Sequence, residues 1–226
     1  MGFAVTVRHS AAWQMSSILL SSQGACLLVD PGYFPRELDE LAVLTEARGE
    51  LAGVVFTHSH FDHVAGWQRF PKAQVWGSPA LAAAARVGEA RELDEARTFD
   101  QRWYVQRPWD LCWPEVHDLA AGRRLEVGGA LLEALLLPGH CVDGLALLAP
   151  EDGLLLVGDY LSPCEIPFVD DLGAYRVTLL RLRELLRGAV TTVIPGHGPR
   201  LRQDEALAIA AADLAYLDQL AACVER

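Results

Sequence analysis

The chain has 226 residues, of which 51% are hydrophobic and 22% charged, a composition that suits one substantial core and no disordered tail. Its formal net charge is −11 and Lys72 is its one lysine. This charge excludes a general electrostatic attraction to nucleic acid or to an anionic membrane. We therefore expect a single domain over residues 1–226 with no nucleic-acid or membrane partner.

The five cysteines are an odd number and form no CxxC pair, which indicates free thiols in a reducing compartment. The N-terminus has no basic segment followed by an apolar stretch, so we expect no signal peptide. No uninterrupted apolar run approaches the roughly 20 residues that span a bilayer. These features predict a cytoplasmic protein.

The first part of the chain alternates apolar runs with turn residues, which predicts strands. These runs cover 3–7, 15–20, 25–30, 51–57 and 73–78. Residues 35–48 have apolar positions at helical spacing, with Pro35 in the first turn and Gly49 after the end, and predict a helix. A second helix is expected to begin at Pro79, with Ser78 as its N-cap.

The pattern breaks down at about 86–120, in an insertion that is first polar and then rich in aromatic residues. Four strands are predicted after it, at 123–127, 130–138, 144–150 and 153–159, and their turn residues indicate antiparallel neighbours. The chain closes with a helix at about 172–187, a strand at 191–195 and a helix at about 203–223. Two sheets covered by helices fit this order of elements best.

Residues 56–66 read FTHSHFDHVAG and follow directly on a predicted strand. Residues two apart in an extended chain point the same way, so His58 and His60 can hold one metal ion together. Asp62 and His63 stand where the chain turns toward a helix, so they would project elsewhere and could hold a second ion. Imidazole and carboxylate are ligands that suit zinc, iron or manganese.

Three further candidate ligands each stand at the end of a predicted strand, after a glycine that lets the backbone turn. They are His140 in LLLPGHC, Asp159 in LLLVGDY and His197 in TVIPGHG. Five of the seven histidines therefore fall at strand ends. His9 and His117 match no such position, and we expect them to be surface or local hydrogen-bonding residues.

The segment HSHFDH resembles the HxHxDH motif of the metallo-β-lactamase superfamily. The three later candidates match its further ligand positions in order, and the resemblance covers nearly the whole chain. It implies an α/β fold, the four-layer αββα sandwich. It also implies that His58, His60 and His140 hold one ion, that Asp62, His63 and His197 hold the other, and that Asp159 bridges the two.

By this resemblance we expect a dinuclear-metal-dependent hydrolase with two divalent ions, zinc first, with iron or manganese as alternatives. Two ions about 3.5–4 Å apart can share a water and lower its pKa toward ~7, which supplies a metal-bound hydroxide. Asp62 and Asp159 are the expected catalytic carboxylates, and Asp62 would orient the hydroxide. The expected substrate is a small molecule with an ester, thioester or lactone bond.

The motif set looks most like the glyoxalase II-type branch, with two departures. Only 29 residues follow His197, fewer than the helical extension that helps to bind glutathione in that branch would need. The residues after Asp159, YLSPCEIPFVDD, differ from the usual GDTLF segment of that branch. These departures disfavour a hydroxyacylglutathione substrate.

The insertion places Trp103, Trp109 and Trp113 close together in the sequence. They predict either a lid over the metals that walls an apolar acyl group, or rings that pack a local helix or a homodimer contact. Tyr160, next to Asp159, would either donate to an oxyanion or pack.

Candidates for binding a substrate anion are Arg102, Arg107 and Arg176. Two rival functions remain open from the sequence. One is a mononuclear-iron enzyme similar to persulfide dioxygenases, which would use the first histidine, the PGH histidine and the aspartate. The other is a non-catalytic metal-binding scaffold.

Overall fold

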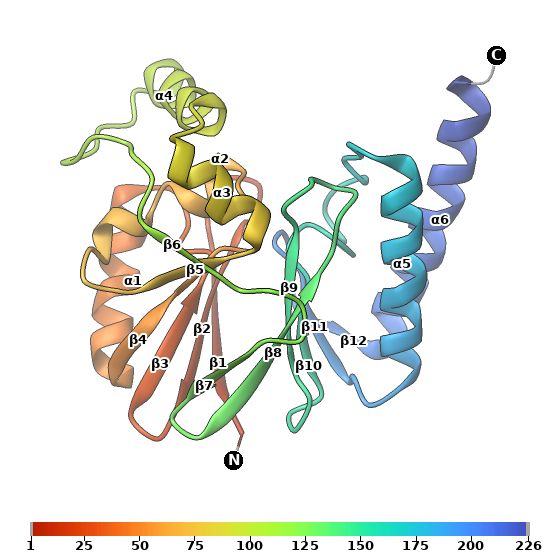
Figure 1. Cartoon of the computed structure of the whole chain (residues 1–226), viewed down its shortest axis with the longest axis horizontal. Coiled ribbons are helices and arrows are strands. Elements are labelled where there is room, and N and C mark those ends of the chain that lie inside the picture. Colours follow the sequence, from red (N-terminus) through yellow and green to blue (C-terminus); the bar gives the residue numbers. More distant parts are fainter. Residues whose placement is uncertain (1, 225–226) are drawn as a thin grey trace.

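Two six-stranded sheets face each other in the computed structural model, which describes residues 2–224 (Figure 1). The strand order is β1-β2-β3-β4-β5-β6 in the first sheet and β12-β11-β10-β9-β8-β7 in the second. Helices α1 and α3 cover the outer face of the first sheet, and α5 and α6 cover that of the second. This is the predicted αββα sandwich, with its central core between the sheets.

The strands of the first sheet are β1 (Ala4–His9), β2 (Ser16–Ser22), β3 (Ala25–Val29), β4 (Glu50–Val55), β5 (Val75–Gly77) and β6 (Val116–Asp118). Those of the second are β7 (Arg124–Val127), β8 (Ala130–Leu136), β9 (Leu145–Ala149), β10 (Leu154–Leu156), β11 (Thr192–Ile194) and β12 (Leu201–Arg202). The helices are α1 (Pro35–Arg48), α2 (Phe61–Val64), α3 (Pro79–Val87), α4 (Arg91–Trp103), α5 (Leu172–Arg187) and α6 (Gln203–Val224), with a 3₁₀ turn, η1 (Trp67–Arg69).

Strand β2 shows why the sheets stack as they do. Its Ile18 and Leu20 side chains enter the core between the two sheets, whereas Leu19 packs on the opposite face, in the core under α1 and α3. Alternate residues of a strand point to opposite faces, so a strand buried on both faces must be apolar throughout. The uninterrupted apolar runs of the sequence follow from this burial.

Two parallel strand pairs bring the predicted ligands to one edge of the sandwich. Strands β3 and β4 are parallel and pair Val29 with Val55, while β10 and β11 are parallel and pair Leu156 with Ile194. Parallel neighbours end at the same edge of a sheet, so the residues that follow each strand meet there. At this edge the backbone N–H of Leu145 donates to the carbonyl of Thr57 at 2.7 Å, which joins the two sheets.

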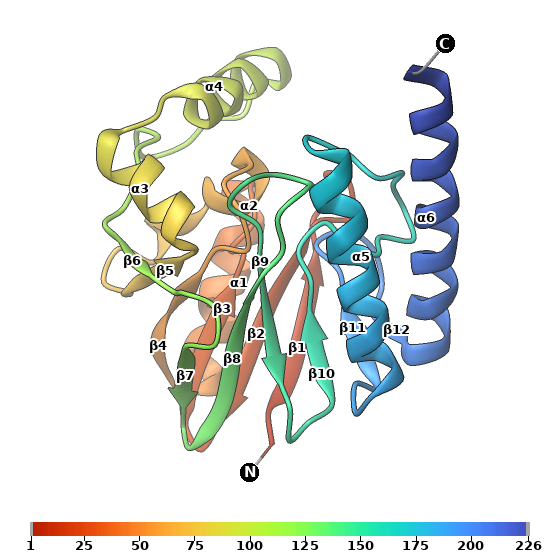
Figure 2. The ribbon, with the colours of Figure 1, turned by 45° about the vertical axis from the view of Figure 1, so that its right-hand side comes forward.

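The insertion at about 86–120, where the sequence pattern breaks down, holds regular elements. It contains a polar helix, α4, and the edge strand β6. Helix α4 buries Leu93 and Ala96 one turn apart, and Phe99 is half-buried one turn further on. Charged residues at most other positions of α4 obscured this helical spacing in the sequence. Figure 2 shows α4 above α2, at the edge that carries the HxHxDH segment.

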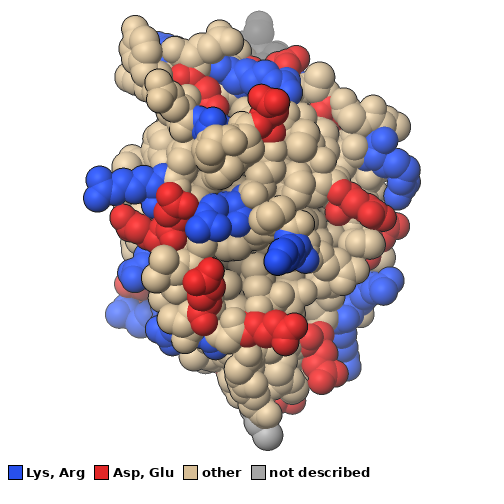
Figure 3. Space-filling model, turned by 90° about the vertical axis from the view of Figure 1, so that its left-hand side faces the viewer, with Lys and Arg blue, Asp and Glu red and all other residues tan. Residues whose placement is uncertain are grey.

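Helix α6 is the one helix among residues 2–224 that is long and apolar enough, over Gln203–Cys223, to cross a membrane. Length and composition alone are weak evidence that a helix spans a membrane, because the core helices of soluble proteins pass the same test. Its Ala206, Ala210 and Leu217 side chains are fully buried in the core that it shares with α5. The face of the molecule in Figure 3, by contrast, carries acidic and basic side chains interspersed.

Candidate metal centre

The seven predicted ligands converge in the structure, although they come from four separate segments of the chain. His58 and His60 follow β4, Asp62 and His63 lie in α2, and the other three follow β8, β10 and β11. Their side chains form two groups, in each of which the ligand atoms lie within 4.8 Å of one another. The groups are His58, His60, His140 and Asp159, and then Asp62, His63 and His197.

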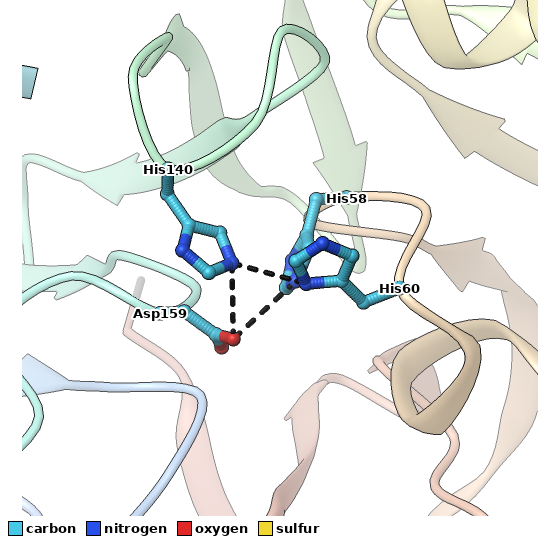
Figure 4. Close-up of side chains that lie close together, drawn as sticks. All are labelled: His58, His60, His140 and Asp159. Carbon is cyan, nitrogen blue, oxygen red and sulfur yellow. Dashed lines mark hydrogen bonds and ion pairs between the residues drawn. The ribbon is translucent and has the colours of Figure 1, made fainter. Parts of the chain in front are cut away.

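The first group turns three imidazole nitrogens and one carboxylate oxygen toward a common point (Figure 4). His60 Nδ1 lies 3.0 Å from His58 Nε2 and 3.1 Å from His140 Nε2. Asp159 Oδ2 lies 3.4 Å from His58 Nε2 and 3.3 Å from His140 Nε2. Ligands about 2.1 Å from a tetrahedral zinc ion stand roughly 3.4 Å apart, so this donor set fits such an ion.

The second group has a similar spacing. His63 Nε2 lies 3.3 Å from His197 Nε2 and 3.6 Å from Asp62 Oδ2. His197 Nε2 lies 3.4 Å from the same carboxylate oxygen. Two imidazoles and one carboxylate are a donor set suited to a divalent ion.

The carboxylate of Asp159 joins the two groups. Its Oδ2 faces the first group, while its Oδ1 lies 3.2 Å from His63 Nε2 and 3.5 Å from His197 Nε2. This Oδ1 is buried and has no hydrogen-bond partner among the described residues. A buried carboxylate oxygen without a partner is costly, and a bound cation on this side would offset the cost. The site therefore fits divalent cations.

The outward nitrogens of His140 and His197 face backbone carbonyls. The Nδ1 of His140 lies 3.0 Å from the carbonyl oxygen of Phe168, and that of His197 lies 3.0 Å from the carbonyl oxygen of Trp13. A carbonyl can only accept, so each Nδ1 carries the hydrogen and donates it. In the neutral form of each ring, Nε2 then keeps a free lone pair that points into the centre, as a metal ligand requires.

A buried pair, Asp30 and Thr57, fixes the rings of His58 and His63 in the same way. The Thr57 hydroxyl donates to Asp30 Oδ2 at 2.6 Å, so it accepts from His58 Nδ1 at 3.0 Å. Asp30 Oδ2 also accepts from His63 Nδ1 at 2.9 Å. In the neutral form of each ring the hydrogen is therefore on Nδ1, and Nε2 faces the centre with a lone pair that a cation can use.

Burial and the neighbouring carboxylates shift the pKa values of the histidines in the centre in opposite directions. Burial lowers the pKa of His60 to about 2 and also lowers the pKa of His58, so both imidazoles are neutral at physiological pH. Burial acts to lower the pKa of His63 too, but the adjoining carboxylates of Asp159 and Asp62 outweigh it and raise that pKa well above 6.5. Burial also acts to lower the pKa values of His140 and His197, but Asp159 outweighs it and raises both, so the carboxylates favour a positive charge in both groups.

Sequence reasoning did not single out Asp30, Thr57 or Trp13 as parts of this centre. Asp30 stands at the end of a predicted strand, as Asp159 does, and this position was the sign in the sequence that Asp30 could belong to the site. It has a left-handed backbone, with φ of 49°, which aspartate adopts more readily than most residues. The role of the Trp13 carbonyl depends on tertiary structure alone, since a backbone acceptor leaves no mark on the sequence.

Tyr160 lies behind the ligands. Its hydroxyl donates to the carbonyl of Pro138 at 2.8 Å and accepts from the backbone N–H of His140 at 3.0 Å. The ring is 2% exposed and packs against Tyr175. These contacts place the hydroxyl where it holds the His140 loop, which is the packing role of the two that the sequence left open.

The three tryptophans of the insertion have separate places. Trp103 is 59% exposed at the end of α4 and lines a cavity beside the centre. Trp113 lines a second cavity, which His60 also borders, and its indole donates to the carbonyl of Glu89 at 2.7 Å. Trp109 packs on the core under the first sheet.

Only one of the three candidate arginines borders a cavity near the metals. Arg107 is buried, pairs with Asp100 at 2.6 Å and stacks over the Tyr33 ring. Arg176 pairs with Asp218 of α6. Arg102 lines the same cavity as Trp103.

A cleft of about 320 Å³ opens onto the centre. Four ligands, His60, Asp62, His140 and His197, line it together with the bridging Asp159. Its other walls are Trp13, Phe61, Glu92, Glu95, Glu165 and Phe168. A small molecule can therefore reach the ligand atoms from solvent. His9 and His117 lie outside this cleft, and His9 contacts the hydroxyl of Ser16.

Comparison with known proteins agrees with the geometry. The sequence profile of the metallo-beta-lactamase superfamily matches residues 11–197. The chain is 29% identical over 177 residues to the lactamase-like protein adaB of Aspergillus niger, covering 77% of this chain and 47% of that protein. It is 30% identical over 138 residues to a hydroxyacylglutathione hydrolase of Synechococcus sp., covering 59% and 43%. The chain thus spans less than half the length of these two relatives.

Solved structures share the fold. The metallo-beta-lactamase family protein TTHA1429 from Thermus thermophilus aligns with a TM-score of 0.73 and 21% identity, over 96% of this chain and 80% of that one. TTHA1623, solved in a di-iron-bound form, aligns with a TM-score of 0.67 and 25% identity, over 88% and 96%. Because the superfamily profile covers most of its length, this chain belongs to the metallo-beta-lactamase superfamily.

Proposed function

We propose that this protein is a hydrolase that holds two divalent ions and cleaves an ester, thioester or lactone of a small molecule. One observation carries the proposal: five imidazole nitrogens point at two adjacent centres that share the carboxylate of Asp159. When bound, a pair of such ions would activate water near neutral pH and polarise the bond to be cleaved. The relative named hydroxyacylglutathione hydrolase supports an acyl substrate.

The chain's own side chains would position the reactants. Asp62 lies in the second group and lines the cleft, so its carboxylate can accept a hydrogen bond from the attacking water and orient it. Hydrolysis adds water across the acyl–oxygen or acyl–sulfur bond. The acid product takes the hydroxyl group, and the leaving alcohol or thiol takes the proton.

The second group of ligands favours two ions over the mononuclear rival. A single iron would need only His58, His140 and Asp159. Asp62, His63 and His197 are nevertheless buried and closely spaced, and a buried carboxylate and a backbone carbonyl fix the two imidazoles. Such orientation of ring nitrogens is typical of metal ligands, which also argues against a scaffold without a reactive centre.

The test is a comparison of metal content and turnover. Protein loaded separately with zinc, manganese and ferrous iron is assayed with a thioester, a lactone and bis-p-nitrophenyl phosphate, while elemental analysis gives ions per chain. We expect about two ions per chain and hydrolysis of at least one acyl substrate. His140→Gln should lose ions and turnover, whereas His117→Gln, which changes a histidine outside the centre, should keep both.

Two results would contradict the proposal. The first is hydrolysis at an undiminished rate by protein that chelation has freed of metal. The second is one iron per chain with oxygen consumption, which would favour the mononuclear rival.

A further inference from the structure

The cavity that Trp103 lines has a volume of about 850 Å³ and adjoins the cleft. Half of its lining residues are aromatic. Its aromatic members are Trp13, Phe34, Phe61, Phe99 and Trp103, and we call this cavity the aromatic groove. Trp13, Phe61 and Glu95 border both the groove and the cleft. The groove therefore begins where the metal ligands end.

The rings of the groove form a continuous series that starts between two ligands. Phe61 stands between His60 and Asp62 in the sequence, and its ring lies 5.8 Å from that of Phe99. Phe99 lies 6.2 Å from Trp103, measured like the first distance between ring centroids. Trp13 closes one side, at 5.9 Å from Phe61 and 5.2 Å from Phe99. Rings at this spacing pack against one another, so they form one continuous apolar surface on which a flat apolar group can lie.

Charge distinguishes the aromatic groove from the other cavity beside the cleft. The groove is lined by one acidic residue, Glu95, and one basic residue, Arg102, whose charges are opposite. The other cavity, of about 420 Å³ beside His60, also has apolar walls, but its charged lining residues are four acidic ones, Glu89, Glu92, Asp143 and Asp170, and one arginine, Arg91. An uncharged apolar group is thus better accommodated in the groove, and a polar leaving group in the acidic cavity.

We propose that the aromatic groove binds the acyl half of the substrate, and that this acyl group is large, planar and uncharged. The assignment rests on the proposed hydrolysis at the metal centre, because it places the reactive carbonyl in the cleft and the rest of the acyl group along the rings from Phe61 to Trp103. Helix α4 then selects the substrate, since it supplies Phe99 and Trp103.

The first test is a selectivity ratio. Acetyl and 2-naphthoyl esters or thioesters of one and the same leaving group are compared by kcat/KM. We expect the wild type to prefer the naphthoyl substrate, and Trp103→Ala to lower the ratio of naphthoyl to acetyl about tenfold, the loss expected for one aromatic contact. The ratio is insensitive to the fraction of active or metal-loaded protein.

A neighbouring aromatic residue provides the matched control. Tyr104 follows Trp103, is 89% exposed and does not line the groove. Its backbone φ is 56°, so asparagine is the suitable replacement. Tyr104→Asn should leave the ratio at the wild-type value.

A second test measures binding without turnover. N-methyl-2-naphthamide, which resists hydrolysis, is titrated into metal-free protein by NMR, and we expect Trp103→Ala to weaken binding at least fivefold while Tyr104→Asn does not. If no acyl substrate is hydrolysed under any metal, the proposed function fails, and this titration still decides whether the groove takes a planar apolar group.

Three outcomes would overturn the assignment of the groove. One is an unchanged ratio in Trp103→Ala. Another is the same naphthamide affinity in wild type and variant, or no binding by either. The third is a concentration-dependent dimer that Trp103→Ala abolishes with no change in the ratio, because a second copy of the chain would then be the occupant.

Discussion

The carboxylate of Asp30 accepts a hydrogen bond from His63 Nδ1 at 2.9 Å, in a place where neither side chain meets solvent. The same carboxylate accepts from the backbone N–H of Thr57 at 2.8 Å and from its hydroxyl. Asp30 therefore orients imidazoles that face both groups of the centre, one directly and the other through Thr57, without being a ligand itself.

Replacing Asp30 with asparagine should weaken metal binding. The variant keeps the left-handed backbone, which asparagine tolerates, but it loses the charge that favours the Nδ1–H form of His63. We expect a 10- to 100-fold loss of metal affinity in a competition assay with a chelator. Asp39→Asn, at an exposed aspartate of α1, is the control. Equal affinities in the Asp30 variant and the wild type would rule out this role.

Bound metal should raise the melting temperature of the protein, because its ligands come together in one site only in the folded state. At an ion concentration a hundred times the dissociation constant, one site adds about 2.7 kcal/mol to the free energy of unfolding. Asp159→Asn removes the shared carboxylate charge, so most of the zinc-dependent increase should vanish in thermal denaturation. An increase of wild-type size in this variant would show that the two groups do not share Asp159.

Tyr160→Phe should lower stability while leaving substrate affinity nearly unchanged. The hydroxyl accepts from the buried backbone N–H of His140, and leaving this donor unsatisfied costs about 1–3 kcal/mol, whereas the Pro138 carbonyl keeps its hydrogen bond from Thr178. We expect denaturant unfolding to reveal this loss and KM to stay within twofold. If KM rose tenfold with stability intact, Tyr160 would instead contact the substrate.

Asp213 should make stability depend on pH. It is a buried carboxyl on α6, and burial raises its pKa to about 6 from 3.8. The folded state thus favours the protonated form, and the stability that this group contributes below pH 3.8 is lost as pH rises through about 6. Asp213→Asn should exceed the wild type in stability at pH 8 by up to roughly 2 kcal/mol and show no gain at pH 3.5.

The exposed Asp218 of the same helix gives the comparison for Asp213. Asp218→Asn removes one carboxylate of α6 without touching a buried group, and its effect on the pH profile should be small. Unfolding curves of all three proteins between pH 3.5 and 8 make the measurement. A pH-independent difference between Asp213→Asn and the wild type would contradict the assigned cause.

Most of the fold could be predicted from the sequence because its strands are buried on both faces. The run 25–30 is apolar up to its last residue and became β3, and the ends of 35–48 carried proline and glycine signals that match α1. Helix α4 escaped prediction because tertiary contacts bury only a few of its residues, so its apolar spacing is weak beside its charges. Strand β12 has two residues, too few to leave a pattern.

The candidate site was predictable to the extent that it consists of side chains with a fixed spacing. The HxHxDH segment and the histidines and aspartate after glycine gave all seven predicted ligands. The backbone groups that orient them were not predictable, since the carbonyls of Trp13 and Phe168 act through atoms that every residue possesses. The aromatic groove depends on how α4 lies over α2, which no local pattern encodes.

Trp13 has two roles, because its carbonyl accepts a hydrogen bond from His197 and its side chain lines the aromatic groove. On the proposed function, a lineage that adapts to new acyl groups cannot remodel the segment around Trp13 without also disturbing the orientation of His197, a candidate metal ligand. Phe99 and Trp103 have no such second role in orienting a candidate ligand. Divergence in substrate preference among relatives of this protein should therefore accumulate on α4, while the hairpin that carries Trp13 changes slowly.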